Sequence, residues 1–530
     1  MEAIIQRVRP YLSIFIVTIM LFSFLYFKFG AHHIPDFDSY YHVKMAKIML
    51  EKGFIKEFPW MYFTFQKDHF TNPYLLFHMY LAFWVLLFKS IPMVGAKWGM
   101  LVLTALIPVA CLRIVNLFST KWNFFFALLF FACLTPMVYS RFIVARPHVL
   151  STLLLLVGVE LLARRKWWML FALAWIYSYS YSACFLLPIL AGISAIVFSI
   201  NQKKIVWEPI FFSVTGMIMG LSINPAFPHN LNFLYIVTFK MGIGHSAYAG
   251  RELLSLPAWP LFMSHIFTLS IIFAGLLTVM MTTRKCSENS VFIFAVSGFF
   301  LMLMAHSVRF SEYWPFMAMI SVAVLFIEFF DNNKTAVSFF RRYLSIICMC
   351  VFVIVGFFNV SSSYKNIITI IPMAELNEIM NVLNRDAKEG DIVYTEDWEM
   401  FSPMFYECDK VNYMLGLDPE TMKVAHPGLF TLWFMINRGR VIDENIPQNI
   451  SMIEKYTHDP EITKIRMDME NGLFALNVPS LIKRAFNAKW ILITHGHYGE
   501  EYDMKSFFAR YPQEIIQSAG NRFFTLYKVK

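Results

Sequence analysis

Charged residues are scarce in this chain. Asp, Glu, Lys and Arg make up 15% of its 530 residues, whereas hydrophobic residues make up 58% and aromatic residues 18%. The mean hydropathy is correspondingly high, at +0.53. A soluble globular protein of this size has no means of burying so much apolar surface, because its core grows too slowly with chain length. The composition therefore predicts an α-helical polytopic membrane protein.

Cysteine is also sparse, and its placement excludes two further classes of protein. The seven cysteines lie mostly in or beside apolar runs and show no spacing typical of a metal site, so neither a structural zinc nor a disulfide framework is expected. Internal repeats and low-complexity segments are absent from the sequence. The first apolar run, Tyr11 to Phe27, has no small-residue cleavage site after it and is expected to remain as an anchor.

The net charge of +9 does not indicate nucleic acid as a partner. Lys and Arg lie in short turns between apolar runs, which is the pattern that fixes membrane topology. Arg7 and Arg9 precede the first span and predict a cytoplasmic N-terminus, in the inner membrane if the protein is bacterial. The segment 29–72 is then an outer loop, and so is 224–260. The apolar runs that alternate between the two sides after Lys121 are 122–140, 147–163, 167–182, 183–200, 208–223, 261–282, 290–306, 313–330 and 343–360.

One stretch does not follow this alternation. Residues 73–121 must connect outside to inside, which needs an odd number of crossings, but only two apolar runs are visible, Pro73–Ile91 and Trp98–Phe118. One of them is re-entrant or interfacial, or the stretch holds three short crossings. The expected total is about eleven to thirteen spans.

The composition changes near residue 360. Residues 1–360 are expected to form the membrane domain and residues 361–530 a soluble α/β domain outside the cytoplasm. Strands are predicted at Asp391–Thr395, Trp490–Thr494 and Phe523–Val529, and a helix at Met373–Lys388.

Four groups of polar residues fall on the predicted outer side of the membrane. An outward-facing acid and a membrane-level arginine suit a reaction on a lipid-linked phosphate, because cationic groups can neutralise a leaving diphosphate while a carboxylate orients the acceptor. The groups are Asp36 and Asp38 with Tyr41 and His42, the turn from Arg141 to His148, the loop 224–260 with Glu252, and the segment His306–Phe310 with Arg309.

These groups resemble the GT-C-type glycosyltransferases, and among them the catalytic subunit of oligosaccharyltransferase. That family carries D-P-W-Y-H in its first outer loop, and this chain reads Asp38-Ser39-Tyr40-Tyr41-His42. The family also has a functional Glu in a long outer loop followed by four spans, and Glu252 is likewise followed by four apolar runs. A V-R-F follows that loop, as Val308-Arg309-Phe310 does here. The resemblance covers the membrane part of the chain.

The chain departs from the family pattern at two places. The second acidic motif, D-x-D or D-x-E, should fall near residues 138–150, where this chain has Arg141, Arg146 and His148 but no acid. The W-W-D-Y-G of the C-terminal domain is also absent, and the nearest segment is Glu396–Met400. Protein N-glycosylation is therefore not implied, and the acceptor is left open as a lipid, a polysaccharide or another protein site.

The resemblance implies a glycosyltransferase that uses a polyprenyl-phosphate-linked saccharide at the outer leaflet, among membrane lipids. It implies that Asp38 is the main catalytic or metal-binding acid and that Asp36 supports it. Glu252 would position donor or acceptor, and Arg309 and Arg146 would bind the donor phosphate. A divalent cation, Mg²⁺ or Mn²⁺, would be held by Asp38 and His148.

Simpler interpretations remain for each of these residues. Asp36 and Asp38 suit the first turn of a helix, and Arg309 at a span end suits snorkelling to the interface. Arg146 and His148 suit head-group binding or a span cap, and Trp398 suits a buried anchor of the α/β domain. For the whole protein the alternatives are a transporter or flippase of lipid-linked saccharide, which would more often show repeats, and a non-catalytic subunit of an envelope polysaccharide assembly system.

Overall fold

The computed structural model describes residues 2–241, 258–280, 286–332, 338–340, 343, 345–367, 372–495 and 503–530. The chain forms two compact units, each built from separated segments. Unit 1 comprises residues 1–35, 72–234 and 251–368, and unit 2 comprises residues 36–71, 235–250 and 369–530.

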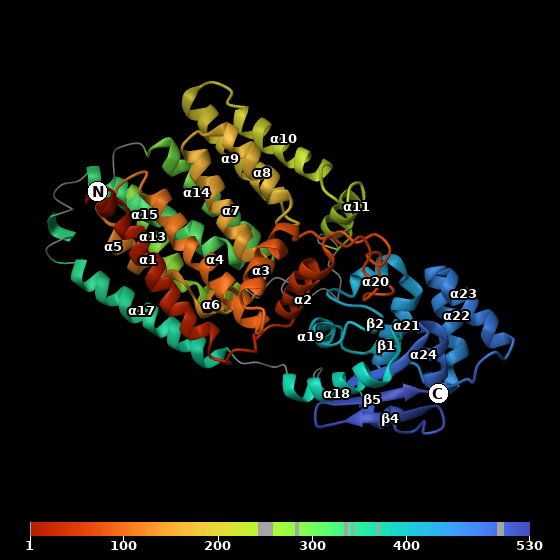
Figure 1. Cartoon of the computed structure of the whole chain (residues 1–530). Coiled ribbons are helices and arrows are strands. Elements are labelled where there is room, and N and C mark those ends of the chain that lie inside the picture. The colour runs from red at the N-terminus through yellow and green to blue at the C-terminus, as the bar shows by residue number, and fades with distance from the viewer. Residues whose placement is uncertain are drawn as a thin grey trace. The chain divides into compact units, whose positions relative to one another are not determined.

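Unit 1 is helical throughout the part that the structure describes (Figure 1). The helices of unit 1 are α1 (Glu2–Tyr26), α3 (Leu75–Leu87), α4 (Pro92–Val115), α5 (Asn123–Cys133), α6 (Pro136–Phe142), α7 (His148–Ala163), α8 (Trp167–Ser178), α9 (Leu186–Gln202), α10 (Glu208–Ser222), α11 (His229–Tyr235), α12 (Ala258–Ser264), α13 (Ile266–Met280), α14 (Glu288–His306), the short 3₁₀ helix η3 (Val308–Glu312), α15 (Trp314–Asn332) and α17 (Ser345–Asn366).

These helices coincide with the apolar runs of the sequence. Four of the described helices, α1, α4, α14 and α17, are long and apolar enough to cross a membrane, and seven shorter apolar helices accompany them. Such lengths and compositions identify an integral membrane protein of the polytopic helical class, as predicted. The number of crossings and their direction stay predictions.

The run 122–140 is not a straight helix. It forms α5 and α6, which are bent by 92° at a short break. Pro136 occupies the first turn of α6, where its missing N–H costs nothing and its fixed φ favours a new helix start. The bend places the C-terminal end of α6 next to the short connection that leads into α7.

Unit 2 contains one sheet and the helices around it (Figure 1). Its elements are α2 (Phe37–Lys52), the π-helical turn η1 (Ile236–Met241), α18 (Met373–Asp386), β1 (Ile392–Thr395), η5 (Trp398–Met400), α19 (Phe401–Glu407), β2 (Asn412–Tyr413), α20 (Glu420–Ala425), α21 (Pro427–Asn437), η6 (Asp443–Asn445), α22 (Ile446–Thr457), α23 (Pro460–Glu470), α24 (Val478–Phe486), β3 (Ala488–Thr494), α25 (Met504–Phe508), β4 (Ile515–Gly520) and β5 (Phe524–Val529).

The sheet of unit 2 is mixed, with strand order β2-β1-β3-β5-β4. β1 pairs in parallel with both β2 and β3, whereas β5 lies antiparallel between β3 and β4. The three strands and the helix predicted from the sequence are confirmed as β1, β3, β5 and α18. Helices α21, α22 and α24 supply much of the apolar core against the sheet. This is the α/β domain that the sequence predicts.

The segment 36–71 is part of unit 2 and extends its sheet. Met61 forms an isolated parallel bridge to Tyr413 of β2. The Tyr62 N–H donates to the Tyr413 carbonyl at 2.9 Å, and the Tyr413 N–H donates to the Trp60 carbonyl at 3.0 Å. Helix α2 packs beside α19, where the rings of Tyr40 and Tyr406 meet edge to face with centroids 5.5 Å apart. The segment is therefore built into a folded domain, whereas its placement on the outer side of the membrane stays a prediction.

Candidate functional site

The junction of α6 and α7 gathers the basic residues that the sequence singled out. Arg141 lies in the last turn of α6, and His148 is the first residue of α7. Arg146 lies in the connection between them and is half-buried, close enough for its charge to act on His148. The Arg141 carbonyl lies beside the His148 ring, so these residues meet at the N-terminal end of α7.

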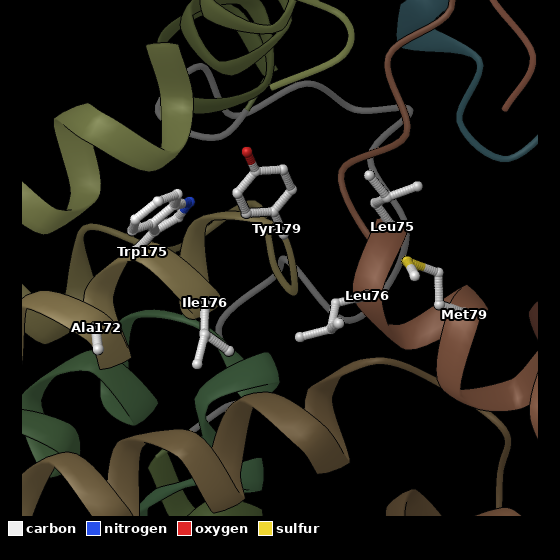
Figure 2. A pocket seen from close by; sticks show the side chains of 7 residues that line it. All are labelled: Leu75, Leu76, Met79, Ala172, Trp175, Ile176 and Tyr179. Atoms are coloured by element: carbon white, nitrogen blue, oxygen red, sulfur yellow. The ribbon is translucent and has the colours of Figure 1, made fainter. Parts of the chain in front are cut away.

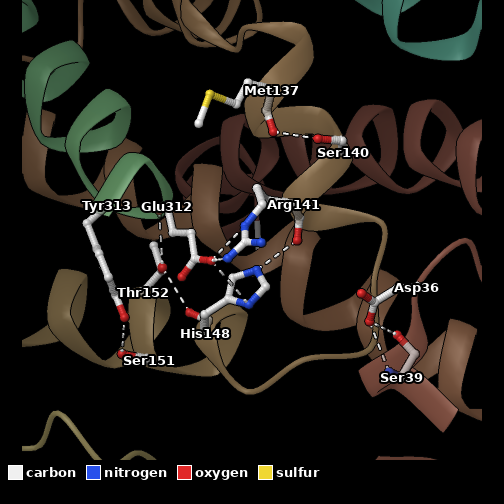
Figure 3. A network of polar contacts seen from close by, with 10 residues as sticks. All are labelled: Asp36, Ser39, Met137, Ser140, Arg141, His148, Ser151, Thr152, Glu312 and Tyr313. Atoms are coloured by element: carbon white, nitrogen blue, oxygen red, sulfur yellow. Dashed lines mark hydrogen bonds and ion pairs between the residues drawn. The ribbon is translucent and has the colours of Figure 1, made fainter. Parts of the chain in front are cut away.

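Glu312 anchors Arg141 in a buried ion pair (Figure 3). Its side chain is only 1% exposed. The Arg141 Nε donates to Glu312 Oε1 at 2.8 Å, and the Arg141 Nη2 donates to the same oxygen. Such a pair holds the guanidinium in one orientation, and removal of Arg141 would take the ion-pair partner from the buried Glu312 carboxylate.

His148 completes this cluster. Its Nε2 lies 2.7 Å from the Arg141 carbonyl oxygen, and its Nδ1 lies 3.8 Å from Glu312 Oε1. Because a carbonyl can only accept a hydrogen bond, Nε2 carries the proton and donates. The imidazole therefore ties the backbone of Arg141 to the start of α7.

A layer of buried hydroxyl groups continues from the ion pair into the helices. Ser151 Oγ lies 2.7 Å from the Tyr177 hydroxyl and 3.0 Å from the Tyr313 hydroxyl. Thr152 Oγ1 donates to the His148 carbonyl at 2.9 Å. Hydrogen-bonded side chains of this kind join neighbouring helices in an apolar surrounding, so α7, α8 and the start of α15 are fixed around the ion pair.

Arg309 lies in the same 3₁₀ turn as Glu312. Side chains at i and i+3 eclipse one another in a 3₁₀ helix, so Arg309 and Glu312 lie on one side of that turn. Arg309 is half-buried, and its charge acts on the buried phenol of Tyr181. The turn thus carries both Arg309, which is predicted to bind the donor phosphate, and Glu312, whose carboxylate holds Arg141.

Sequence reasoning missed Glu312, although a signal for it was present. The segment Phe310-Ser311-Glu312-Tyr313-Trp314 places one acid between two apolar runs. An ionisable residue at membrane level is costly and therefore indicates a paired or functional group. The hydroxyl partners Ser151 and Tyr177 gave no comparable signal, because isolated Ser and Tyr are common in membrane helices.

The residues around His148 do not fit a divalent cation. Among the residues that the structure describes, no group of three or more His, Cys, Asp or Glu side chains is arranged to hold a metal ion. The Glu312 carboxylate, which lies 3.8 Å from His148, is engaged by Arg141, and Arg146 adds a second positive charge nearby. The charges of Arg141 and Arg146 disfavour a cation bound at His148. The Mg²⁺ or Mn²⁺ prediction therefore depends on Asp38, which lies in unit 2.

Asp36 and Asp38 lie at the start of α2. Asp36 is the N-cap residue, and its Oδ2 accepts hydrogen bonds from the Ser39 N–H at 3.0 Å and the Ser39 hydroxyl at 2.8 Å (Figure 3). This confirms the simpler interpretation for Asp36, a helix-starting acid. Asp38 lies in the first turn and is half-buried, whereas the residues from Ser39 to His42 are buried. Asp38 is thus the most accessible residue of its motif.

The remaining candidates lie in two places. Glu252 is outside the residues that the structure describes. Glu396 follows β1, and burial of its carboxyl group raises its pKa to about 8. Trp398 packs against the apolar core of unit 2, which supports its interpretation as an anchor.

The described residues thus form a helical bundle in unit 1 and a mixed α/β domain in unit 2. No protein-family model and no curated protein sequence matches the chain. Solved structures do match. The oligosaccharyltransferase of Archaeoglobus fulgidus in the apo form aligns with a TM-score of 0.59 and 11% identity over 91% of this chain and 69% of that chain.

Two further structures of this fold contain lipid phosphates. The archaeal oligosaccharyltransferase AglB from Archaeoglobus fulgidus, in complex with an inhibitory peptide and a dolichol-phosphate, aligns with a TM-score of 0.59 and 10% identity, again over 91% and 69% of the two chains. ArnT from Cupriavidus metallidurans, bound to undecaprenyl phosphate, aligns with a TM-score of 0.58 and 12% identity over 98% of this chain and 97% of that chain. The predicted similarity to GT-C glycosyltransferases is therefore confirmed at the level of the fold.

Proposed function

We propose that this protein is a glycosyltransferase that moves a sugar or oligosaccharide from a polyprenyl-phosphate-linked donor to an acceptor at the outer face of the membrane. The observation that carries the proposal is the buried Arg141–Glu312 pair with Arg309 in the same short turn. A chain that buries an ion pair to hold a guanidinium beside further arginines is built to receive an anion. The fold supports the same activity, because similar structures bind dolichol-phosphate and undecaprenyl phosphate.

In this proposal the donor phosphate is bound by Arg309, assisted by Arg146. A guanidinium presents a planar fork that matches two phosphate oxygens, and it stays charged at any physiological pH. Arg141 is held by Glu312 and contributes a fixed positive charge to the leaving phosphate as it departs. The positive charges stabilise the transition state because they are in place before the negative charge develops.

Glu312 also offers a position for a sugar. Its Oε2 atom is buried and has no hydrogen-bond partner among the described residues. A buried acceptor without a donor is costly, and hydroxyl groups of a bound saccharide are donors that such an oxygen accepts. This observation favours a saccharide over a simple lipid phosphate as the bound group.

Asp38 acts on the acceptor in this proposal. Its carboxylate removes the proton from the acceptor hydroxyl as the acceptor oxygen bonds to the anomeric carbon, and the bond from that carbon to the phosphate oxygen breaks. The lipid phosphate leaves with the electron pair. Asp36 holds the start of α2 in place, and Glu252 positions donor or acceptor.

Replacement of Arg309 tests the donor site. Arg309→Ala should lower affinity for a polyprenyl-phosphate donor by about 1.5–3 kcal/mol, the range for a hydrogen bond to a charged group. Arg309→Lys should restore only part of that affinity, because an ammonium group lacks the fork. Equilibrium binding of the labelled donor to purified protein measures both effects.

The matched control is Arg164→Ala. Arg164 forms an ion pair with Glu160 at 2.9 Å and is largely exposed, at 44%, so its loss should leave donor affinity unchanged. Donor affinity in Arg309→Ala equal to that of the control would leave snorkelling as the role of Arg309.

A further inference from the structure

An apolar pocket of about 290 Å³ lies between α3 and α8 in unit 1 (Figure 2). One side of the pocket is formed by Leu75, Leu76 and Met79 of α3, and the opposite side by Ala172, Trp175 and Ile176 of α8 (Figure 2). Its lining is almost wholly apolar. An amphipathic ligand could place only its hydrocarbon part in such a pocket.

The helices that form the pocket are held firmly. The Leu76 N–H donates to the Tyr179 carbonyl at 3.0 Å and joins the start of α3 to the end of α8. Gly216 and Gly220 of α10 allow close backbone contact with α8. A Cβ at Gly216 would collide with the Phe171 carbonyl, and a Cβ at Gly220 would lie 3.0 Å from Trp175 Cδ1. These contacts hold α8 against α3 and α10.

The pocket is connected to the polar layer around Ser151 through the end of α8. Ile176 lines the pocket, whereas the next residue, Tyr177, bonds Ser151 in the polar layer. Tyr74, which precedes α3, contacts Tyr181 with ring centroids 5.9 Å apart. The positive charge of Arg309 in turn acts on the Tyr181 phenol. The same short stretches of chain thus present an apolar surface on one side and a basic, hydroxyl-rich surface on the other.

We infer that this pocket binds the isoprenoid segment next to the phosphate of the donor, while Arg309 binds the phosphate itself. The inference rests on the proposed function and adds a site for the lipid chain. The continuity from Arg309 through Tyr181 and Tyr74 to Leu75 favours one ligand with an anionic end and a hydrocarbon chain. A methyl-branched isoprenoid is the chain that a polyprenyl phosphate presents there.

The test fills the pocket from either side. Ala172→Phe and, independently, Met79→Phe should weaken binding of undecaprenyl phosphate to the purified full-length protein about tenfold, because the added ring occupies the ligand's space. Met169→Phe adds the same ring on α8 outside the pocket lining and should bind as the unaltered protein does. A second probe, dioleoyl phosphatidic acid, carries the same phosphate monoester on straight acyl chains, and its binding should change much less.

The outcomes separate this inference from the proposed function. Loss of undecaprenyl phosphate binding in both filled variants, with Met169→Phe unaffected, supports the pocket. Binding that is lost in Arg309→Ala but retained in the filled variants overturns the pocket alone. Equal losses for phosphatidic acid overturn the isoprenoid as occupant. Binding retained in Arg309→Ala contradicts the proposed donor site itself.

Discussion

Asp38→Asn is expected to lower sugar transfer by at least about 10²-fold, the range for loss of a positioned acid–base group. The amide nearly preserves the shape of the carboxylate but removes its charge and its capacity to accept a proton. Asp38 is half-buried in the first turn of α2, and an amide of nearly the same size fits in its place. The variant should therefore fold and insert normally. Initial rates of transfer at saturating donor, measured beside expression level, report the effect.

Asp36→Asn is the matched control for this prediction. Asp36 caps α2 through its hydrogen bonds to Ser39, and Asn is as good an N-cap as Asp. Transfer by Asp36→Asn should stay close to that of the unaltered protein. The opposite order of effects would identify Asp36 as the catalytic acid, and full activity in both variants would contradict the transferase proposal.

Glu312→Ala is expected to destabilise the protein by about 1.5–3 kcal/mol, since it removes a buried carboxylate that accepts hydrogen bonds from the half-buried Arg141 guanidinium. Glu288→Ala provides the comparison, because Glu288 pairs with Arg165 at the surface and is 30% exposed. Its loss should cost less than about 1 kcal/mol. The unfolding midpoint of the purified protein in detergent distinguishes the two variants. Equal midpoints would show that the Arg141–Glu312 pair is not a buried anchor.

A double variant separates the structural role of this pair from its role in binding. Arg141→Met combined with Glu312→Leu replaces the pair by apolar side chains of similar size, and such replacements often restore stability. We expect a midpoint near that of the unaltered protein but weaker donor binding, because the fixed positive charge is gone. Donor binding at the unaltered level would limit the pair to a structural role.

The membrane helices could be predicted because hydropathy alone determines where apolar segments lie. The predicted run 290–306 corresponds to α14, Glu288–His306, and the run 343–360 to α17, Ser345–Asn366. The break between α5 and α6 was not predicted, although Pro136 lies at the break. A proline near the middle of an apolar run is compatible with either a kink or a new helix, and tertiary packing decides between them.

The fold of residues 36–71 could not be predicted from local sequence. Helix α2 carries three lysines, and Lys44 is nonetheless buried, with its Nζ 3.2 Å from the Asp409 carboxylate. That partner lies far along the chain, so no local pattern indicates it. The short strand β2 and strand β4, which ends at Gly520, were missed for a similar reason. Their residues have little intrinsic preference for a strand, and pairing with β1 and β5 stabilises them.

The candidate site, too, could be predicted only in part from the sequence. Arg309 and the basic turn around Arg146 could be selected from sequence, because charged residues at membrane level are rare. The partner that fixes Arg141 lies 171 residues away at Glu312. Only the packing of η3 against α6 and α7 brings the two together. The roles assigned to Asp38, Arg309, Arg146 and Glu252 stay predictions.

The most direct test of the central claim is transfer of a radiolabelled sugar from polyprenyl-phosphate-linked donors by the purified protein in proteoliposomes. The account predicts that label leaves the donor and appears in an acceptor fraction, and that Asp38→Asn abolishes this transfer while still binding the donor. The assay uses a panel of donors and membrane acceptors, because neither the sugar nor the acceptor is specified by the proposal. Label that stays on every donor, or only crosses the bilayer, would contradict the account and favour an assembly subunit or a transporter.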